Sequence, residues 1–179
     1  GGESAIIHKD AVKEYLLKHP DISIIFATAR YADVYNDIPN TKYYCLVGNE
    51  AKRLANKVRK DKFDGTCILA PYPRKMGTDV PSFAQEHTYE LPEISFTKQY
   101  QDSCTTIGLQ TALYLGTNSI FVIGYDGYIG EILSEKETAL TNENRILFND
   151  FKKETGLELT SLTPTLYKEL NLVSIYQHL

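Results

Sequence analysis

Residues 104–127, CTTIGLQTALYLGTNSIFVIGYDG, contain the unit of sequence that decides the fold. Hydroxyl side chains open the first half, an Ala/Leu-rich body follows, and Gly116 closes it, which predicts a helix. The second half, residues 119–125, is a short apolar run rich in β-branched side chains, which predicts a buried strand. A helix followed at once by such a strand is typical of a parallel sheet covered by helices.

The same alternation continues on both sides of this unit. Helices are expected at residues 10–18, 50–60 and 135–154, and strands at residues 22–28, 42–47, 66–70, near 87–91, and 158–162. We therefore predict a three-layer αβα sandwich with a mostly parallel, Rossmann-like sheet. Residues 71–101, which include four prolines, are predicted to form a long irregular loop.

Length and composition limit the classes of protein. A chain of 179 residues suits one α/β domain spanning residues 1–179. A net charge of −4 argues against a nucleic-acid partner, and no apolar run is long enough to predict a membrane partner. The three cysteines lack the spacing of metal ligands, so we predict no metal site, reduced thiols and a cytoplasmic protein.

The beginning of the chain suggests that it is the C-terminal part of a longer protein. Met76 is the only methionine, and residues 1–4, GGES, resemble a glycine-rich turn after a strand that is not there. We expect the domain either to tolerate the loss of an edge of its sheet or to leave that edge for another segment to cover.

Candidate site residues follow the predicted strands, because ligands bind outside the carboxyl ends of parallel strands. Hydroxyl groups and free amides at a helix start bind phosphate, and Asp126 is the candidate catalytic residue, accepting a sugar hydroxyl or holding a metal through water. The predicted ligand- and phosphate-binding residues are Ser4, Arg30, Ser103, Thr105, Thr106, Gly108, Asp126, Gly127 and Asn144. Arg74 and Lys75 are further candidates to neutralise phosphate.

Each candidate also has a purely structural interpretation. Residues 103–106 would serve as an ordinary helix cap, Gly108 would allow close helix–sheet packing, and Asp126-Gly127 would form a plain turn. Asn144 lies on an apolar helix face, where it would bind the backbone of a nearby loop. The chain contains no GxGxxG, P-loop, GxSxG or HExxH motif, which argues against the commonest nucleotide oxidoreductases, P-loop proteins and α/β-hydrolases.

Residues 104–127 resemble the family related to archaeal 6-hydroxymethylpterin diphosphokinase, whose fold is similar to some bacterial sialyltransferases. Both patterns lead from a hydroxyl-rich helix start through Leu-Gly to a strand that ends in Gly-aromatic-Asp. That family also has a GxGPS turn, which residues 1–4 match at its end with Glu3 in place of proline. This resemblance implies a transferase that acts on a nucleotide-activated substrate.

A second resemblance rests on residues 126–128, 142–144 and 161–167. These segments are similar to the C-terminal domain attached to some bacterial aldolase-like proteins of the HMG-CoA lyase superfamily, whose N-terminal barrel resembles 4-hydroxy-2-oxovalerate aldolase. The resemblance implies a catalytic N-terminal domain in the same chain. The His-x-His metal motif of the barrel is absent here, so these residues alone should have no aldolase activity.

These observations support three functional hypotheses. The first is a ligand-binding or regulatory domain of an aldolase-like enzyme that recognises a nucleotide, a sugar nucleotide or a similar small anion, with Mg²⁺ as the accompanying cofactor. The second is a transferase. The third, suggested by 13 tyrosines and no complete catalytic set, is a structural module that forms a homodimer.

Overall fold

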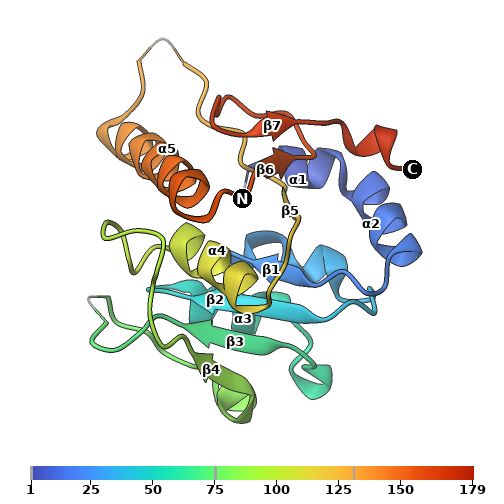
Figure 1. The fold of residues 1–179 in the computed structure, drawn as a ribbon. Coiled ribbons are helices and arrows are strands. Elements are labelled where there is room, and N and C mark those ends of the chain that lie inside the picture. Colours follow the sequence, from blue (N-terminus) through green and yellow to red (C-terminus); the bar gives the residue numbers. More distant parts are fainter. Residues whose placement is uncertain (1, 75, 131) are drawn as a thin grey trace.

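The computed structural model describes residues 2–74, 76–130 and 132–179 and is a mixed α/β structure (Figure 1). One sheet has the order β1-β2-β3-β4, and a second has the order β5-β6-β7. Neighbouring strands in both sheets pair in parallel, which confirms the predicted fold class. The strands are β1 (Ile24–Phe26), β2 (Lys42–Leu46), β3 (Thr66–Leu69), β4 (Thr88–Glu90), β5 (Ile120–Val122), β6 (Leu159–Ser161) and β7 (Asn171–Leu172).

Helices cover both faces of the strands, as a three-layer sandwich requires. Because side chains alternate across a strand, Tyr44 and Leu46 of β2 join the cluster under α3, whereas Cys45 joins the cluster under α4. Phe26 of β1 contacts both the α3 cluster and the α2 cluster, which places α2 and α3 on one face. The helices are α1 (Ser4–Ile7), α2 (Lys9–Lys18), α3 (Glu50–Lys57), α4 (Cys104–Tyr114) and α5 (Glu135–Thr155).

The ends of α4 and α5 follow the sequence signals. The hydroxyl of Ser103 accepts a hydrogen bond from the Thr106 amide at 3.2 Å and caps α4. Gly156 ends α5 in the left-handed conformation, with φ +71°. The predicted apolar face of α5 is confirmed, because Leu147, Phe148 and Phe151 are buried at the centre of the core.

The segment 71–101 contains strand β4, where a strand near residues 87–91 was predicted. It also contains a 3₁₀ helix, Ser82–His87, that the sequence analysis did not predict. One prediction needs correction: the strand predicted at residues 22–28 is only three residues long and half-buried rather than fully buried. After β6 the chain forms a loop that includes Pro164, then β7 and a 3₁₀ helix, Ile175–Gln177.

The remaining 3₁₀ helices, Ala29–Tyr35 and Lys60–Lys62, follow β1 and α3. In the described part of the chain, no helix combines the length and the apolar character that crossing a membrane requires.

Gly156→Ala tests the helix end. We expect it to lower the free energy of unfolding by about 1 kcal/mol, because a Cβ strains the left-handed backbone. No other atom lies near enough to add a clash. Gly77→Ala is the control, since Gly77 also has open space around it and no positive φ. Urea unfolding measures both variants, and equal effects would contradict this role of Gly156.

Candidate functional site

The candidate site lies at the carboxyl ends of β1, β2 and β5, beside the start of α4. Glu50, the first residue of α3, is buried and ties the segment after β1 to the segment after β2. Its Oε2 accepts hydrogen bonds from the Ala29 amide at 2.8 Å and from the Thr28 hydroxyl at 3.0 Å. Arg53, one turn along α3, donates to the other carboxylate oxygen of Glu50. The structure thus builds a charged pair at this edge that the sequence analysis missed.

The start of α4 forms the second part of the site. The hydroxyl of Thr105 donates to Asn144 Oδ1 at 2.9 Å and accepts from the Tyr125 hydroxyl at 3.2 Å. Asn144 in turn donates to the Tyr167 hydroxyl at 3.1 Å. Two predicted binding residues, Thr105 and Asn144, are therefore in contact. The partners of Asn144 are side chains of α4 and of the loop after β6, rather than the loop backbone expected from sequence.

Thr106 has a different environment from its neighbour Thr105. Its side chain is fully buried, and its hydroxyl donates to the Tyr100 carbonyl at 2.7 Å. This bond holds the loop before α4 against the first turn of the helix. Thr106 is therefore a buried residue that supports the loop before α4 and does not itself face a ligand. Ser103 and Cys104 are partly exposed.

Asp126 and Ser4, predicted separately as site residues, bind each other. The Ser4 amide donates to Asp126 Oδ2 at 2.9 Å, and the Ser4 hydroxyl donates to Oδ1. The hydroxyl oxygens of Ser4 and Thr163 are also hydrogen-bonded, at 2.9 Å. The Asp126 carboxylate thus anchors the start of α1 to the end of β5, and its catalytic role stays a prediction.

Electrostatic interactions show which charged groups surround the start of α4. Burial raises the pKa of the Cys104 thiol to about 12. Glu50 raises this pKa further, Arg53 lowers it, and Glu143 raises it. Burial also raises the pKa of Glu143, which a hydrogen bond with Ser103 partly offsets. Charged groups from α3 and α5 therefore face the same end of α4.

The three cysteines are free thiols, as predicted. Cys45 and Cys67 are buried, and burial raises the pKa of both thiols. Neither lies at the surface of the site.

The other predicted residues lie around this centre. Arg30 is exposed, with its guanidinium carbon 5.1 Å from the ring centroid of Tyr31. A Cβ on Gly108 would lie 3.6 Å from Ala27 and 3.8 Å from Cys45, so this glycine sits where α4 packs closely on the sheet. Gly127 has φ +82° in the turn after β5 and packs against Leu166.

Of the two additional basic candidates, the structure describes Arg74, whose partners lie away from the start of α4. Arg74 donates to the Ala70 carbonyl at 2.9 Å and pairs with Glu90 of β4. Gly1 and Lys75, also named from sequence, lie outside the described residues.

Of the residues missed by sequence analysis, Glu50, Arg53 and Glu143 are the most important. Glu50 and Arg53 are spaced i, i+3 at the start of a predicted helix, directly after a predicted strand. This spacing could have indicated an ion pair at the carboxyl edge of the sheet. Glu143 lies between Asn142 and Asn144 in a segment that carries the second resemblance.

The chain matches no protein-family model, and searches of curated proteins and of solved structures found no significant match. Across residues 2–74, 76–130 and 132–179, no three His, Cys, Asp or Glu side chains gather as ligands for a metal ion.

Asp126→Asn tests the anchor. We expect it to lower the free energy of unfolding by about 1–3 kcal/mol, because an amide replaces one of the two oxygens that accept from Ser4. Ser4→Ala is the partner in a double-mutant cycle measured by urea unfolding. The two losses should overlap, with a coupling of about 1 kcal/mol. Fully additive losses would contradict a direct Ser4–Asp126 interaction.

Proposed function

We propose that this domain binds a small ligand with an anionic group and hydroxyl groups, such as a nucleotide or a sugar nucleotide. The observation that carries the proposal is a set of hydrogen bonds at one edge of the sheet: Thr105 binds Asn144 and so holds α5 beside the start of α4, and Glu50 binds both Thr28, after β1, and Arg53 of α3. Ser103 and Cys104 are partly exposed at this start of α4. These groups come from separate elements and meet at the carboxyl edge of parallel strands, which is where ligands bind in such folds.

The site would offer hydrogen-bond donors to the phosphate of such a ligand and a carboxylate acceptor to its sugar hydroxyls. The first amides of α4 and the positive end of its helix dipole attract a phosphate. Arg53 is 54% exposed and carries more N–H donors than its bonds to Glu50 and Thr28 use, so it can also bind phosphate oxygens. The Glu143 carboxylate would accept hydrogen bonds from sugar hydroxyls. Mg²⁺ would accompany a nucleotide on its phosphate oxygens.

We further propose that the domain serves as a regulatory or ligand-binding part of a larger aldolase-like enzyme. The three segments that carry this resemblance contact one another. The Leu166 amide donates to the Asp126 carbonyl at 2.9 Å, and Asn144 donates to Tyr167. Segment 161–167 therefore joins the other two segments beside the site.

A transferase that uses a nucleotide-activated donor is the second candidate function, and Glu143 is the observation that favours it. Burial raises the pKa of the Glu143 carboxyl, and this is the direction that suits a carboxyl which takes and gives a proton in catalysis. Glu143 lies beside Ser103, at the point where the donor phosphate would sit.

Arg53→Gln tests the binding proposal by titration calorimetry with a panel of nucleotides and sugar nucleotides, with and without Mg²⁺. We expect a ligand that binds the unmodified domain to bind the variant at least about tenfold more weakly, because a charged hydrogen-bond donor is lost. Lys52→Gln is the control, since it removes the same charge from an exposed neighbouring position on α3. Failure of the whole panel to bind, or equal loss in both variants, would refute the proposal.

Glu143→Gln separates binding from transfer. If the domain is a glycosyltransferase, the sugar of a bound sugar nucleotide passes to an acceptor hydroxyl, or to water when no acceptor is present. Glu143 takes the proton of that hydroxyl or water, and the nucleoside phosphate leaves. The variant should bind the donor while losing more than about a hundredfold in release rate. Chromatography of the nucleotide products measures this release. The same rate in both proteins would contradict an acid–base role for Glu143.

A further inference from the structure

The facing edges of β1 and β5 have no strand partner within the described residues. In β1, the Ile24 amide donates to the Thr41 carbonyl at 2.8 Å, toward β2. Because successive peptide groups of a strand alternate in direction, the Ile25 amide points away from β2. In β5, the Val122 carbonyl accepts from Leu162 at 3.0 Å, so the Phe121 and Ile123 amides point away from β6.

The two edges lie under the same helices. On one face, Ile24 and Phe26 of β1 share a cluster with Ile123, at the end of β5, under α2. On the other face, Ile25 of β1 packs with Ile120 and Val122 of β5 against the cluster that includes α4 and α5. β5 lies on the side of β1 away from β2 (Figure 1). The strands are thus neighbours within one sandwich although they belong to two sheets.

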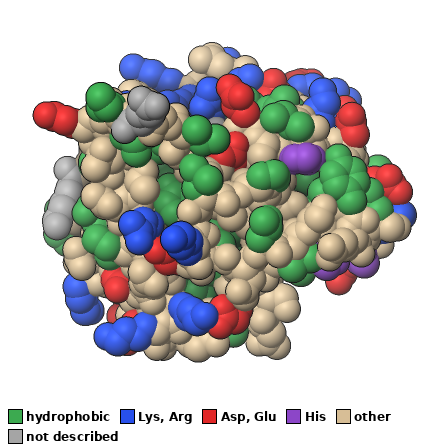
Figure 2. Space-filling view, turned by 90° about the horizontal axis from the view of Figure 1, so that it is seen from above, with side chains coloured by type: hydrophobic (Ala, Val, Ile, Leu, Met, Phe, Trp, Pro, Cys, Tyr) green, Lys and Arg blue, Asp and Glu red, His purple; other side chains and the backbone are tan. Residues whose placement is uncertain are grey.

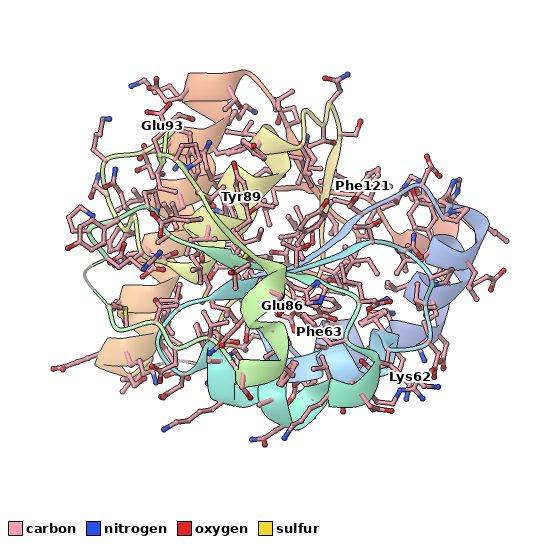
Figure 3. The ribbon with its side chains drawn as sticks, turned by 90° about the horizontal axis from the view of Figure 1, so that it is seen from below. Lys62, Phe63, Glu86, Tyr89, Glu93 and Phe121 are labelled. Atoms are coloured by element: carbon pink, nitrogen blue, oxygen red, sulfur yellow. The ribbon has the colours of Figure 1, made fainter. Side chains whose placement is uncertain are left out.

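The side chains of β1 and β5 are less buried than is usual for apolar strands in a sheet covered by helices. All three β1 side chains are apolar, yet all are half-buried. The adjacent β2 residues Tyr44, Cys45 and Leu46 are almost fully buried. In β5, Phe121 is 38% exposed and contacts Tyr15 of α2 edge-on, with ring centroids 6.3 Å apart (Figure 3). The side chains of an apolar strand in the middle layer are normally buried, because strands lie on both sides of it and helices cover both faces.

The backbone at Gly2 lies at the carboxyl end of the same edge. Its amide donates to the Gly124 carbonyl, just after β5, at 2.6 Å. A Cβ on Gly2 would collide with the Asp126 carboxylate, so only glycine fits at this position without a shift of its neighbours. Ser4 then fixes the start of α1 through Asp126. Gly2 therefore has the position of a residue that ends a strand running beside β5.

We propose that β1 and β5 accept between them an extended, apolar polypeptide strand that runs parallel to both and leads directly into Gly2. Its backbone would pair with Ile25 on one side and with Phe121 and Ile123 on the other. Its side chains would be apolar on both faces, because α2 covers one face and α4 and α5 cover the other. The two sheets would become one, with the new strand at its centre.

The proposed strand would lie at the centre of the joined sheet, whose outer strands would be β4 and β7. The proposal is independent of the ligand proposed above. Figure 2 shows the face above the three-stranded sheet, where hydrophobic side chains are interspersed with polar and charged ones. That face is therefore a poorer acceptor for an apolar segment than the strip between β1 and β5.

The test fuses the segment Thr-Val-Ile-Ile-Val to Gly1 and measures amide hydrogen exchange residue by residue by NMR. We expect exchange at Ile25, Phe121 and Ile123 to slow by at least about tenfold, because each amide gains a carbonyl partner. Exchange at Cys45, within the paired strand β2, is the internal reference. The control protein carries Gly-Ser-Gly-Ser-Gly at the same place and should behave like the unmodified chain.

Two further fusion proteins distinguish strand pairing from aggregation and from non-specific effects of the added segment. Thr-Val-Ala-Val-Ala replaces the first segment if light scattering shows aggregation. It should also protect the three amides, because its central side chains are apolar on both faces. Thr-Val-Pro-Ile-Val should protect them less, because proline removes a ladder donor. Equal exchange in all fusions would overturn the proposal. It would also be overturned if the unmodified chain were a dimer with the three amides already protected, since a second copy would then fill the edges.

Discussion

A strand that lies between two layers of helices needs backbone partners on both sides, and this requirement governs the rest of the structure. Water does not reach such backbone groups freely, so an unpaired amide there costs free energy. β2 and β3 meet the requirement, whereas β1 and β5 meet it on one side only. The half-buried side chains of β1 and the exposed ring of Phe121 both follow from this difference. Apolar side chains of α2 and of the α4–α5 layer pack against both sheets and hold them together.

The candidate site depends on the same place in the fold. Thr28, Glu50 and Arg53 belong to the side of β1, whereas Tyr125 and Asp126 belong to the side of β5. The start of α4 and Glu143 lie near both groups. A strand between β1 and β5 would fix the separation of the two halves, and its end at Gly2 would lie against Asp126. The Ser4–Asp126 contact would then lie between the end of that strand and the candidate site.

The sequence was sufficient for the fold class and for several element ends, because these depend on local patterns. The apolar runs around Cys45 and Ile68 predicted parallel strands, and Ser103 and Gly156 marked helix ends correctly. The site was predicted in part. Ser4 contacts Asp126, and Thr105 contacts Asn144. The members of the first pair are 122 positions apart in the sequence and those of the second pair 39, so no local sequence pattern reveals either contact. Glu50 and Arg53 were missed because a charged pair at a helix start usually indicates a solvated surface.

The most direct test of the central claim is a crystal structure of the chain with Thr-Val-Ile-Ile-Val fused to Gly1. Our account predicts a continuous parallel sheet in which the fused segment lies between β1 and β5. The Ile25 and Phe121 amides should then donate to carbonyl oxygens of that segment at about 2.9 Å. A fused segment lying outside the sheet, or β1 and β5 paired directly with each other, would contradict the account.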